Sequence, residues 1–205
     1  MKRLFPLLLL LCFLSSCQTR LGEGGVVLEC FSLSAERIDS WLRTSDSGMA
    51  IDVIDDGYGV LKSTALEDED MKSQIRSYLE AGGLEFSAGG PNLKYYFYST
   101  EPCVGIVVTA STPMLGRAAG EDLSDLFRIE TGEDVFLFSA DRKLIGRLSG
   151  DKAMSVPEYL ALKPLFLPAF SLKTDGKPEL TSETSFTVRV QFEGDKELVC
   201  VTYRR

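Results

Sequence analysis

Residues 186–192 read Phe-Thr-Val-Arg-Val-Gln-Phe, and this stretch decides the fold class. Its apolar side chains occupy every second position, and polar side chains occupy the positions between them. Such alternation is typical of an antiparallel strand with one face in the core and the other in solvent. Residues 193–196, Glu-Gly-Asp-Lys, have the composition of a turn, and residues 198–203 return as the second strand of a hairpin.

Further short strands are expected on the N-terminal side of this hairpin. They are rich in β-branched or aromatic residues and are separated by segments that contain Gly, Pro or Asp. The expected strands cover residues 26–31, 49–54, 60–66, 93–98, 104–109, 135–139, 144–148 and 170–173. This pattern predicts a mainly β fold, either an antiparallel β-sandwich or an antiparallel sheet with two short helices. An α+β fold is the alternative.

The first expected helix covers residues 34–42. Ser34 can cap it, because a serine side chain accepts a hydrogen bond from the first helical turn. Ile38, Trp41 and Leu42 lie at positions i, i+3 and i+4, which share one face of a helix. The spacing therefore predicts a short helix with Trp41 on the same face as Ile38 and Leu42.

The second expected helix covers residues 67–81. Its first four residues are acidic and offset the positive end of the helix dipole. Met71 and Ile75 recur at helical spacing, and Gly82 ends the helix. A calcium site is the alternative explanation of the acidic run, but the Asp-x-Asp-x-Asp-Gly spacing of an EF-hand is absent. One more helical turn is expected after Ser155, which can act as its cap.

The composition excludes several function classes. The 205 residues include no histidine, so the chain has no Ser-His-Asp or Cys-His catalytic pair and no histidine ligand for zinc or haem. Acidic residues outnumber basic ones by 30 to 22, which gives a formal net charge of −8. An acidic chain is repelled by polyanions, so nucleic acid is not expected as a partner.

The N-terminal residues have the pattern of a secretory signal. Lys2 and Arg3 precede an apolar run over residues 4–14, which is too short for a transmembrane helix of about 20 residues. Residues 14–17 read Leu-Ser-Ser-Cys and resemble the lipobox of bacterial lipoproteins. The resemblance implies that a peptidase cleaves before Cys17 and that Cys17 is acylated. An ordinary secretory signal with a chance cysteine is the alternative.

The lipobox divides the chain into three parts. Residues 1–16 form the signal peptide, residues 17–25 a lipidated tether, and residues 26–205 a single β-rich domain. The resemblance implies a bacterial cell envelope location. The residue after the lipidated cysteine is Gln18, not the aspartate that favours inner-membrane retention, so the outer membrane is expected. Whether the domain faces the periplasm or the cell surface stays open.

The acyl chains are expected to provide the membrane attachment. Loss of Lys2 and Arg3 with the signal leaves 20 basic and 30 acidic side chains, a net charge of −10. An acidic body is repelled by anionic lipid headgroups. The predicted partners are therefore the membrane, through the lipid anchor, and a glycan or an envelope protein, through the domain.

The aromatic run Tyr95, Tyr96, Phe97 and Tyr98 is the candidate ligand face. On a strand, Tyr96 and Tyr98 point one way while Tyr95 and Phe97 point the other. One pair is expected in the core. The other pair can form an exposed platform that stacks on a sugar ring or packs against a partner protein. The alternative is that a second sheet or a helix covers both faces.

The remaining chemistry of the chain is sparse. Cys30, Cys103 and Cys200 lie on or beside apolar strands, so buried free thiols are favoured over a single disulfide with one thiol left over. Their spacing supports neither a metal nor any other cofactor. No Gly-x-Ser-x-Gly or phosphate-binding glycine motif is present, and paired carboxylates are the catalytic option considered.

The C-terminal half resembles small envelope lipoproteins of unknown function from Bacteroides-type bacteria. Residues 120–127, residues 164–168 and the hairpin over residues 186–202 carry this resemblance. It implies a mostly β envelope domain and brings no activity or site with it. We expect a non-catalytic, membrane-anchored binding or interaction module. A structural subunit of an envelope complex or fibre is the alternative, and a carboxylate-dependent hydrolase is less favoured.

Overall fold

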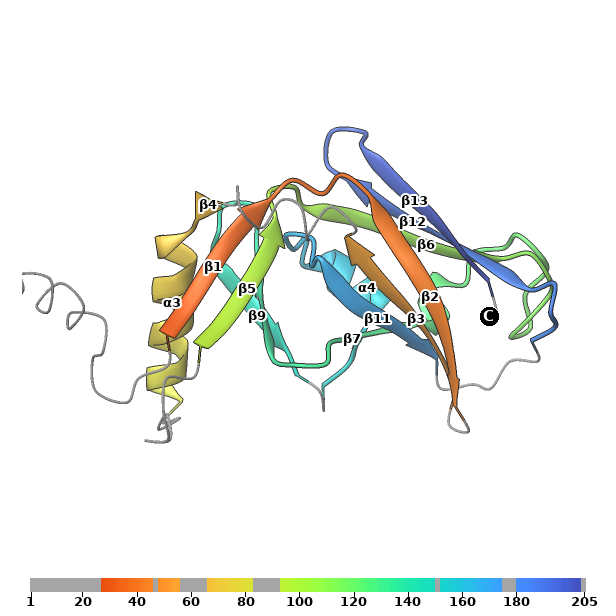
Figure 1. The fold of residues 1–205 in the computed structure, drawn as a ribbon, viewed down its shortest axis with the longest axis horizontal. Coiled ribbons are helices and arrows are strands. Elements are labelled where there is room, and N and C mark those ends of the chain that lie inside the picture. The colour runs from red at the N-terminus through yellow and green to blue at the C-terminus, as the bar shows by residue number, and fades with distance from the viewer. Residues whose placement is uncertain are drawn as a thin grey trace, which may run out of the picture.

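The computed structural model of the chain describes residues 27–45, 48–55, 66–82, 93–149, 152–174 and 180–203. Strands dominate these residues, and the predicted mainly β fold with two helices is confirmed (Figure 1). The elements are β1 (Val27–Leu33), β2 (Ile38–Ser45), β3 (Gly48–Asp55), β4 (Leu66–Glu67), α3 (Glu69–Ala81), β5 (Leu93–Ser99), β6 (Cys103–Ala110), the 3-10 turn η2 (Ser124–Leu126), β7 (Arg128–Glu130), β8 (Val135–Phe138), β9 (Leu144–Leu148), β10 (Met154–Ser155), α4 (Val156–Ala161), β11 (Ala169–Thr174), β12 (Ser185–Phe192) and β13 (Glu197–Tyr203).

The strands form four sheets. The largest has the order β10-β7-β11-β3-β2, two three-stranded sheets have the orders β13-β12-β6 and β4-β1-β5, and β8 pairs with β9. All pairings are antiparallel except that of β1 with β5, which is parallel and departs from the antiparallel expectation. Parallel neighbours need a long crossover, and here β2, β3, β4 and α3 lie between the two strands in the sequence.

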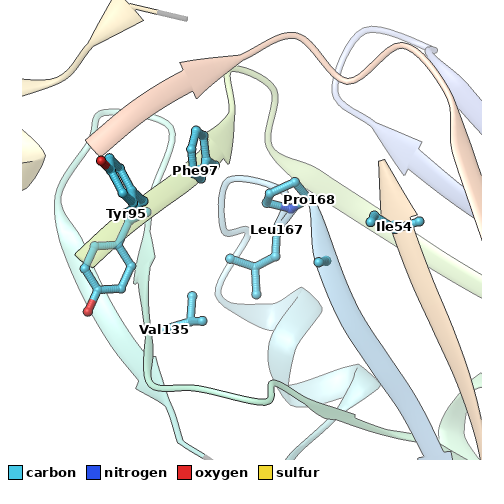
Figure 2. A pocket seen from close by; sticks show the side chains of 8 residues that line it. Ile54, Tyr95, Phe97, Val135, Leu167 and Pro168 are labelled. Atoms are coloured by element: carbon cyan, nitrogen blue, oxygen red, sulfur yellow. The ribbon is translucent and has the colours of Figure 1, made fainter. Parts of the chain in front are cut away.

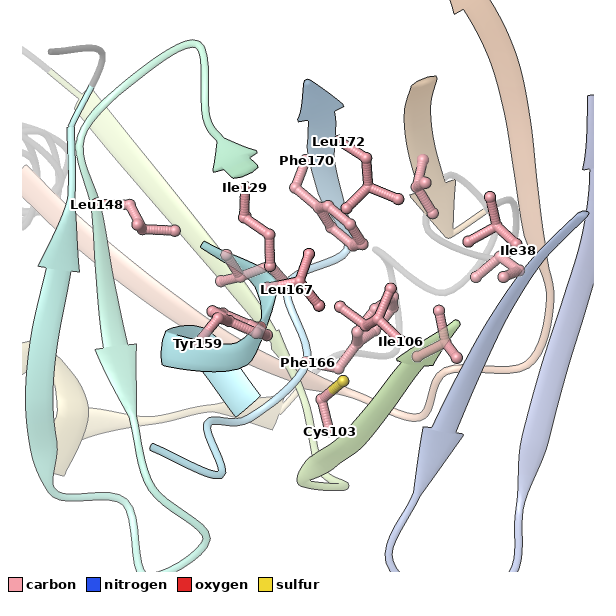
Figure 3. Packing of buried hydrophobic residues seen from close by; sticks show 14 of the residues in the cluster. Ile38, Cys103, Ile106, Ile129, Leu148, Tyr159, Phe166, Leu167, Phe170 and Leu172 are labelled. Atoms are coloured by element: carbon pink, nitrogen blue, oxygen red, sulfur yellow. The ribbon is translucent and has the colours of Figure 1, made fainter. Parts of the chain in front are cut away.

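The five-stranded sheet and the β13-β12-β6 sheet share one hydrophobic core, part of which is shown in Figure 3. The predicted alternation of β12 is confirmed, because its even-numbered residues are buried and its odd-numbered residues are half-buried or exposed. Phe166 joins the two sheets: its ring lies edge-on to Phe170 of β11, at 5.7 Å between centroids, and to Phe192 of β12, at 5.2 Å. Full burial of one such ring contributes about 1.5–3 kcal/mol.

Helix α3 packs beside β1 and against the β8–β9 hairpin (Figure 1). The sequence predicted this helix, and its cap is Asp68, whose carboxylate accepts a hydrogen bond from the Met71 backbone N–H at 3.1 Å. The acidic run thus begins a helix. Gln74 connects the helix to the hairpin through two hydrogen bonds. Its Nε2 donates to the Arg142 carbonyl at 2.7 Å, and its Oε1 accepts from the Leu144 backbone N–H at 2.9 Å.

The expected helix over residues 34–42 is wrong. Residues Ile38–Ser45 form β2, an antiparallel neighbour of β3. Ile38 and Ser40 are buried and Leu42 is half-buried, whereas Trp41 points outward. The buried serine hid the two-residue period, and the chance spacing of three apolar residues imitated a helix. The predicted turn after Ser155 is confirmed as α4, which carries a complete capping box.

The three cysteines of the described domain are buried free thiols, as the sequence favoured. Burial raises the pKa of the Cys103 thiol to about 12, so this group stays protonated and inert at neutral pH. No helix within the described ranges is both long and apolar enough to cross a membrane. The predicted signal peptide, the predicted tether and most of the expected strand over residues 60–66 lie outside the described residues.

Candidate functional site

The aromatic run lies on β5, and its two faces have different surroundings. Tyr96 and Tyr98 point into the core, where the Tyr98 hydroxyl donates a hydrogen bond of 2.7 Å to the Phe136 carbonyl. Tyr95 points outward and is 47% exposed, while Phe97 on the same side is only 8% exposed. The inner pair is therefore structural, and the outer pair remains as the candidate site.

The inner tyrosines do not serve as acids or bases at neutral pH. Burial, followed by the negative charge of Asp134, raises the pKa of Tyr96 to about 12. Burial also raises the pKa of Tyr98 well above its ordinary value. Both phenols stay neutral, because removing their protons would leave an anion in a region of low dielectric constant.

A third ring extends the outer aromatic face. Phe31 of β1 lies opposite Phe97 in the parallel register, and the two rings stack with centroids 5.2 Å apart. Tyr95 completes the group, at 6.3 Å from Phe31 and 6.4 Å from Phe97. The sequence prediction missed Phe31, because only the parallel β1–β5 pairing brings it beside the aromatic run.

The outer aromatic face forms one wall of a small open cavity of about 200 Å³. We call this cavity the aromatic cleft. Figure 2 shows how side chains from β5, from the end of β3, from the start of β8 and from the segment before β11 converge on it. The lining residues are Ile54, Tyr95, Tyr96, Phe97, Val135, Leu167, Pro168 and Ala169. Small-molecule pockets usually enclose about 300–1,000 Å³, so the cleft fits one side chain or one ring.

The aromatic cleft can interact with a ligand mainly through apolar and aromatic contacts. Its lining includes no carboxylate, amine or thiol, and its tyrosine hydroxyls are the only polar side-chain groups. Asp134, which precedes the lining residue Val135, forms an ion pair with Arg147. The cleft thus offers a hydrophobic, aromatic surface and no general acid, general base or nucleophile.

The other predicted functional residue, Cys17, lies outside the described residues. Within the described ranges, no group of three or more acidic or cysteine side chains is arranged to hold a metal ion. The chain has no significant match among protein-family models, curated protein sequences or solved structures. The geometry of the domain and the N-terminal sequence are therefore the observations from which a function is proposed.

Proposed function

We propose that the chain is a bacterial envelope lipoprotein anchored through acyl chains on Cys17, and that its β domain is a non-catalytic binding module. The N-terminal basic residues, the short apolar run and the Leu-Ser-Ser-Cys sequence at residues 14–17 support the anchor. The Gln18 that follows supports delivery to the outer membrane. Several acyl chains hold a protein far more firmly than one, since each buried methylene contributes about 0.8 kcal/mol.

The aromatic cleft is the observation that carries the binding role. Tyr95 is half-exposed, stacks with Phe31 and Phe97, and lines a cavity whose other lining residues are mostly apolar. A contiguous apolar surface of this kind marks an interaction site more often than a single exposed residue does. Interfaces concentrate their binding energy in such places, where an aromatic or aliphatic side chain of the partner enters a small pocket. The cleft therefore supports the insertion of one apolar side chain from an envelope protein.

A sugar fits the aromatic cleft less well than a protein side chain does. A bound sugar needs directional hydrogen bonds to its hydroxyl groups, and unpaired hydroxyls lose affinity. The lining supplies almost nothing beyond the Tyr95 hydroxyl for this purpose. Of the two predicted partner classes, the envelope protein is thus the better match for this cavity.

Site-specific photo-crosslinking tests the binding role. The photoreactive residue p-benzoylphenylalanine would replace Tyr95 in the full-length lipoprotein, expressed in its own host and irradiated in intact cells. Tyr78 on α3 is the matched control, because it is also a tyrosine and is 45% exposed. We expect a discrete protein adduct from position 95 that is absent from position 78. Equal adducts from both positions, or none from position 95, would contradict the proposal.

The lipid anchor has a separate test. Cys17→Ala should abolish incorporation of labelled palmitate and release the domain from membranes or leave the precursor unprocessed. Cys12→Ala is the matched control, because Cys12 lies inside the apolar run and leaves with the signal. Membrane attachment that survives Cys17→Ala unchanged would overturn the anchor without affecting the aromatic cleft.

A structural role in an envelope complex is a second candidate function, and one observation favours it. Val199 and Val201 are both more than two-fifths exposed on β13, the outer strand of the β13-β12-β6 sheet. A row of exposed β-branched residues on an outer strand can pack against another subunit. Co-fractionation of the extracted lipoprotein with a high-mass assembly, lost in a Val199→Lys, Val201→Lys variant, would support this role. A monomer in mild detergent would exclude it.

A further inference from the structure

The outer face of the five-stranded sheet carries a polar row beside the single tryptophan of the chain. Trp41 of β2 lies opposite Asp52 of β3, and Asp52 lies opposite Ser171 of β11. Residues opposite each other in a ladder share one face of the sheet, and here it is the face turned away from the core. Trp41 is 41% exposed, so much of its indole is open to solvent.

Asp52 holds this row together. Its carboxylate accepts hydrogen bonds from the Arg43 guanidinium, one of them at 2.7 Å from Nη2, and from the Ser171 hydroxyl. Burial alone would raise the pKa of Asp52, but these hydrogen bonds and the Arg43 charge outweigh it and hold the pKa below its ordinary value. Asp52 is therefore an ionised carboxylate held by Arg43 and Ser171, directly across the β2–β3 ladder from Trp41.

A hollow of about 400 Å³ adjoins this row. Gly48, which has no side chain, and Ala50 are among its lining residues. Arg43, Ser171, Lys173 and Glu130 contribute polar groups to it. The Lys173 ammonium lies 3.3 Å from a Glu130 carboxylate oxygen, and Arg43 is paired with Asp52, so the charges of the hollow are balanced.

We propose that this surface, made of Trp41, Arg43, Asp52, Ser171 and Lys173 and here named the Trp41 face, is a binding site for a neutral saccharide. The exposed indole supplies a flat apolar platform for the C–H face of a sugar ring. The guanidinium, carboxylate and hydroxyl groups beside it supply the directional donors and acceptors that sugar hydroxyls need. The aromatic cleft has the ring but lacks those groups, whereas the Trp41 face has both.

The electrostatics favour a neutral sugar over an acidic one. The cations of the Trp41 face already have carboxylate partners, so a ligand carboxylate or sulfate would have to displace Asp52 or Glu130. The predicted mature chain also carries a net charge of −10, which repels polyanions. Uncharged hydroxyls can instead add to the hydrogen bonds already present without breaking an ion pair. This proposal does not depend on the partner assigned to the aromatic cleft.

Tryptophan fluorescence provides a direct test, because Trp41 is the only tryptophan in the chain. The full-length lipoprotein in detergent micelles would be titrated with hexasaccharides of β-glucan, α-mannan, xylan and galactan, and with a polygalacturonate hexasaccharide as the acidic comparison. We expect at least one neutral sugar to shift the emission to shorter wavelength and to protect it from acrylamide quenching. No response to any neutral sugar at millimolar concentration, or a response to polygalacturonate alone, would overturn the proposal.

Variants locate the response on the Trp41 face. By calorimetry, Trp41→Ala should weaken binding by at least about tenfold, which corresponds to about 1.4 kcal/mol, and Trp41→Phe should weaken it less because a smaller ring remains. Ser171→Ala should weaken binding while the fluorescence signal is retained. Tyr78→Ala is the control and should bind as the parent does. Undiminished binding by a folded Trp41→Ala variant, or equal loss in Tyr78→Ala, would refute the assignment.

Discussion

The aromatic cleft and the Trp41 face are neighbouring surfaces built on different physics. They adjoin on β3 and β11, where Ile54 and Ala169 line the cleft and Asp52 and Ser171, two residues away on each strand, belong to the Trp41 face. In the cleft, rings stack on rings with almost no hydrogen bonds, so its attraction is non-directional. On the Trp41 face, charged groups fix one another at defined angles. The same sheet surface thus carries an apolar pocket that can accept different apolar side chains. Beside it lies a polar site that requires a defined ligand geometry.

Phe97→Ala should have the largest effect on stability of the changes that separate these two surfaces. The ring is 8% exposed and stacks on Phe31, so its removal leaves a cavity. Truncation of a buried phenylalanine lowers the free energy of unfolding by about 3–5 kcal/mol. Because one side of the cleft is open, we expect a loss of about 3 kcal/mol, at the lower end of this range. Urea unfolding of the parent and the variant measures it. A loss under about 1 kcal/mol would show that the cleft contributes little to the fold.

Asp52→Ala should cost less, about 1–3 kcal/mol, because it removes an acceptor of hydrogen bonds and leaves Arg43 and Ser171 without it. Most of the guanidinium can turn to water, since the Arg43 side chain is largely exposed. A double-mutant cycle with Arg43→Ala isolates the pair by urea unfolding. Additive losses in that cycle would mean that the pair does not act as a unit and that the Trp41 face is not preorganised.

Tyr95→Ala should cost about 0.5–1.5 kcal/mol, the usual range for one aromatic pair at a partly exposed site. The side chain is half-exposed, so only about half of its surface leaves water on folding. The informative result is that binding and stability separate. This variant should no longer bind the protein that crosslinks at position 95, while its melting temperature falls by only a few degrees. A destabilisation as large as that of Phe97→Ala would show that Tyr95 is part of the core and not of a binding surface.

Acidification should produce the smallest effect, and only on the polar surface. The pKa of Asp52 in the folded chain lies below its ordinary value of 3.8. Its contribution to stability is therefore complete above that value and is lost as the pH falls through the folded-state pKa. Urea unfolding at pH 7 and pH 3 should show a smaller acid-induced loss in Asp52→Asn than in the parent. Glu101, whose pKa is also lowered, gives a background that is common to both.

Phe97→Ala is the control for this acid effect, because no ionisable group is removed from the cleft. Its stability should fall by the same amount as that of the parent between the two pH values. An acid dependence of Asp52→Asn equal to that of the parent would contradict the role given to Asp52. It would also weaken the claim that an ionised Asp52 holds Arg43 and Ser171 in place beside Trp41.

The local pattern of the sequence predicted the elements that carry a regular signal. The alternation in β12, the capped helix α3 and the Ser155 cap of α4 are all confirmed, because each depends on residues within a few positions of one another. The prediction failed for β2, where a buried Ser40 interrupts the apolar alternation. It therefore assigned Trp41 to a helix, on the same face as Ile38, and missed the surface that this residue dominates.

The candidate site was only half predictable for a related reason. Strand periodicity predicts that Tyr95 and Phe97 share one face and that Tyr96 and Tyr98 share the other. The sequence pattern is the same whichever face is buried, so it does not identify the buried pair. The covering groups, Phe136 and Phe138, come from β8, about 40 residues further along the chain. Phe31 was missed because the parallel pairing of β1 with β5 leaves no local signal.

The sequence by itself determined the β-rich class, the acidic charge, the absence of imidazole chemistry and the expectation of acylation at Cys17. These features follow from composition and from short motifs. Only the tertiary structure decided which aromatic pair is buried, that Phe31 joins the outer pair, and that Trp41 faces solvent beside Asp52. The physical reason is that periodicity fixes the relation of a residue to its neighbours in sequence, whereas burial depends on strands that pair across long separations.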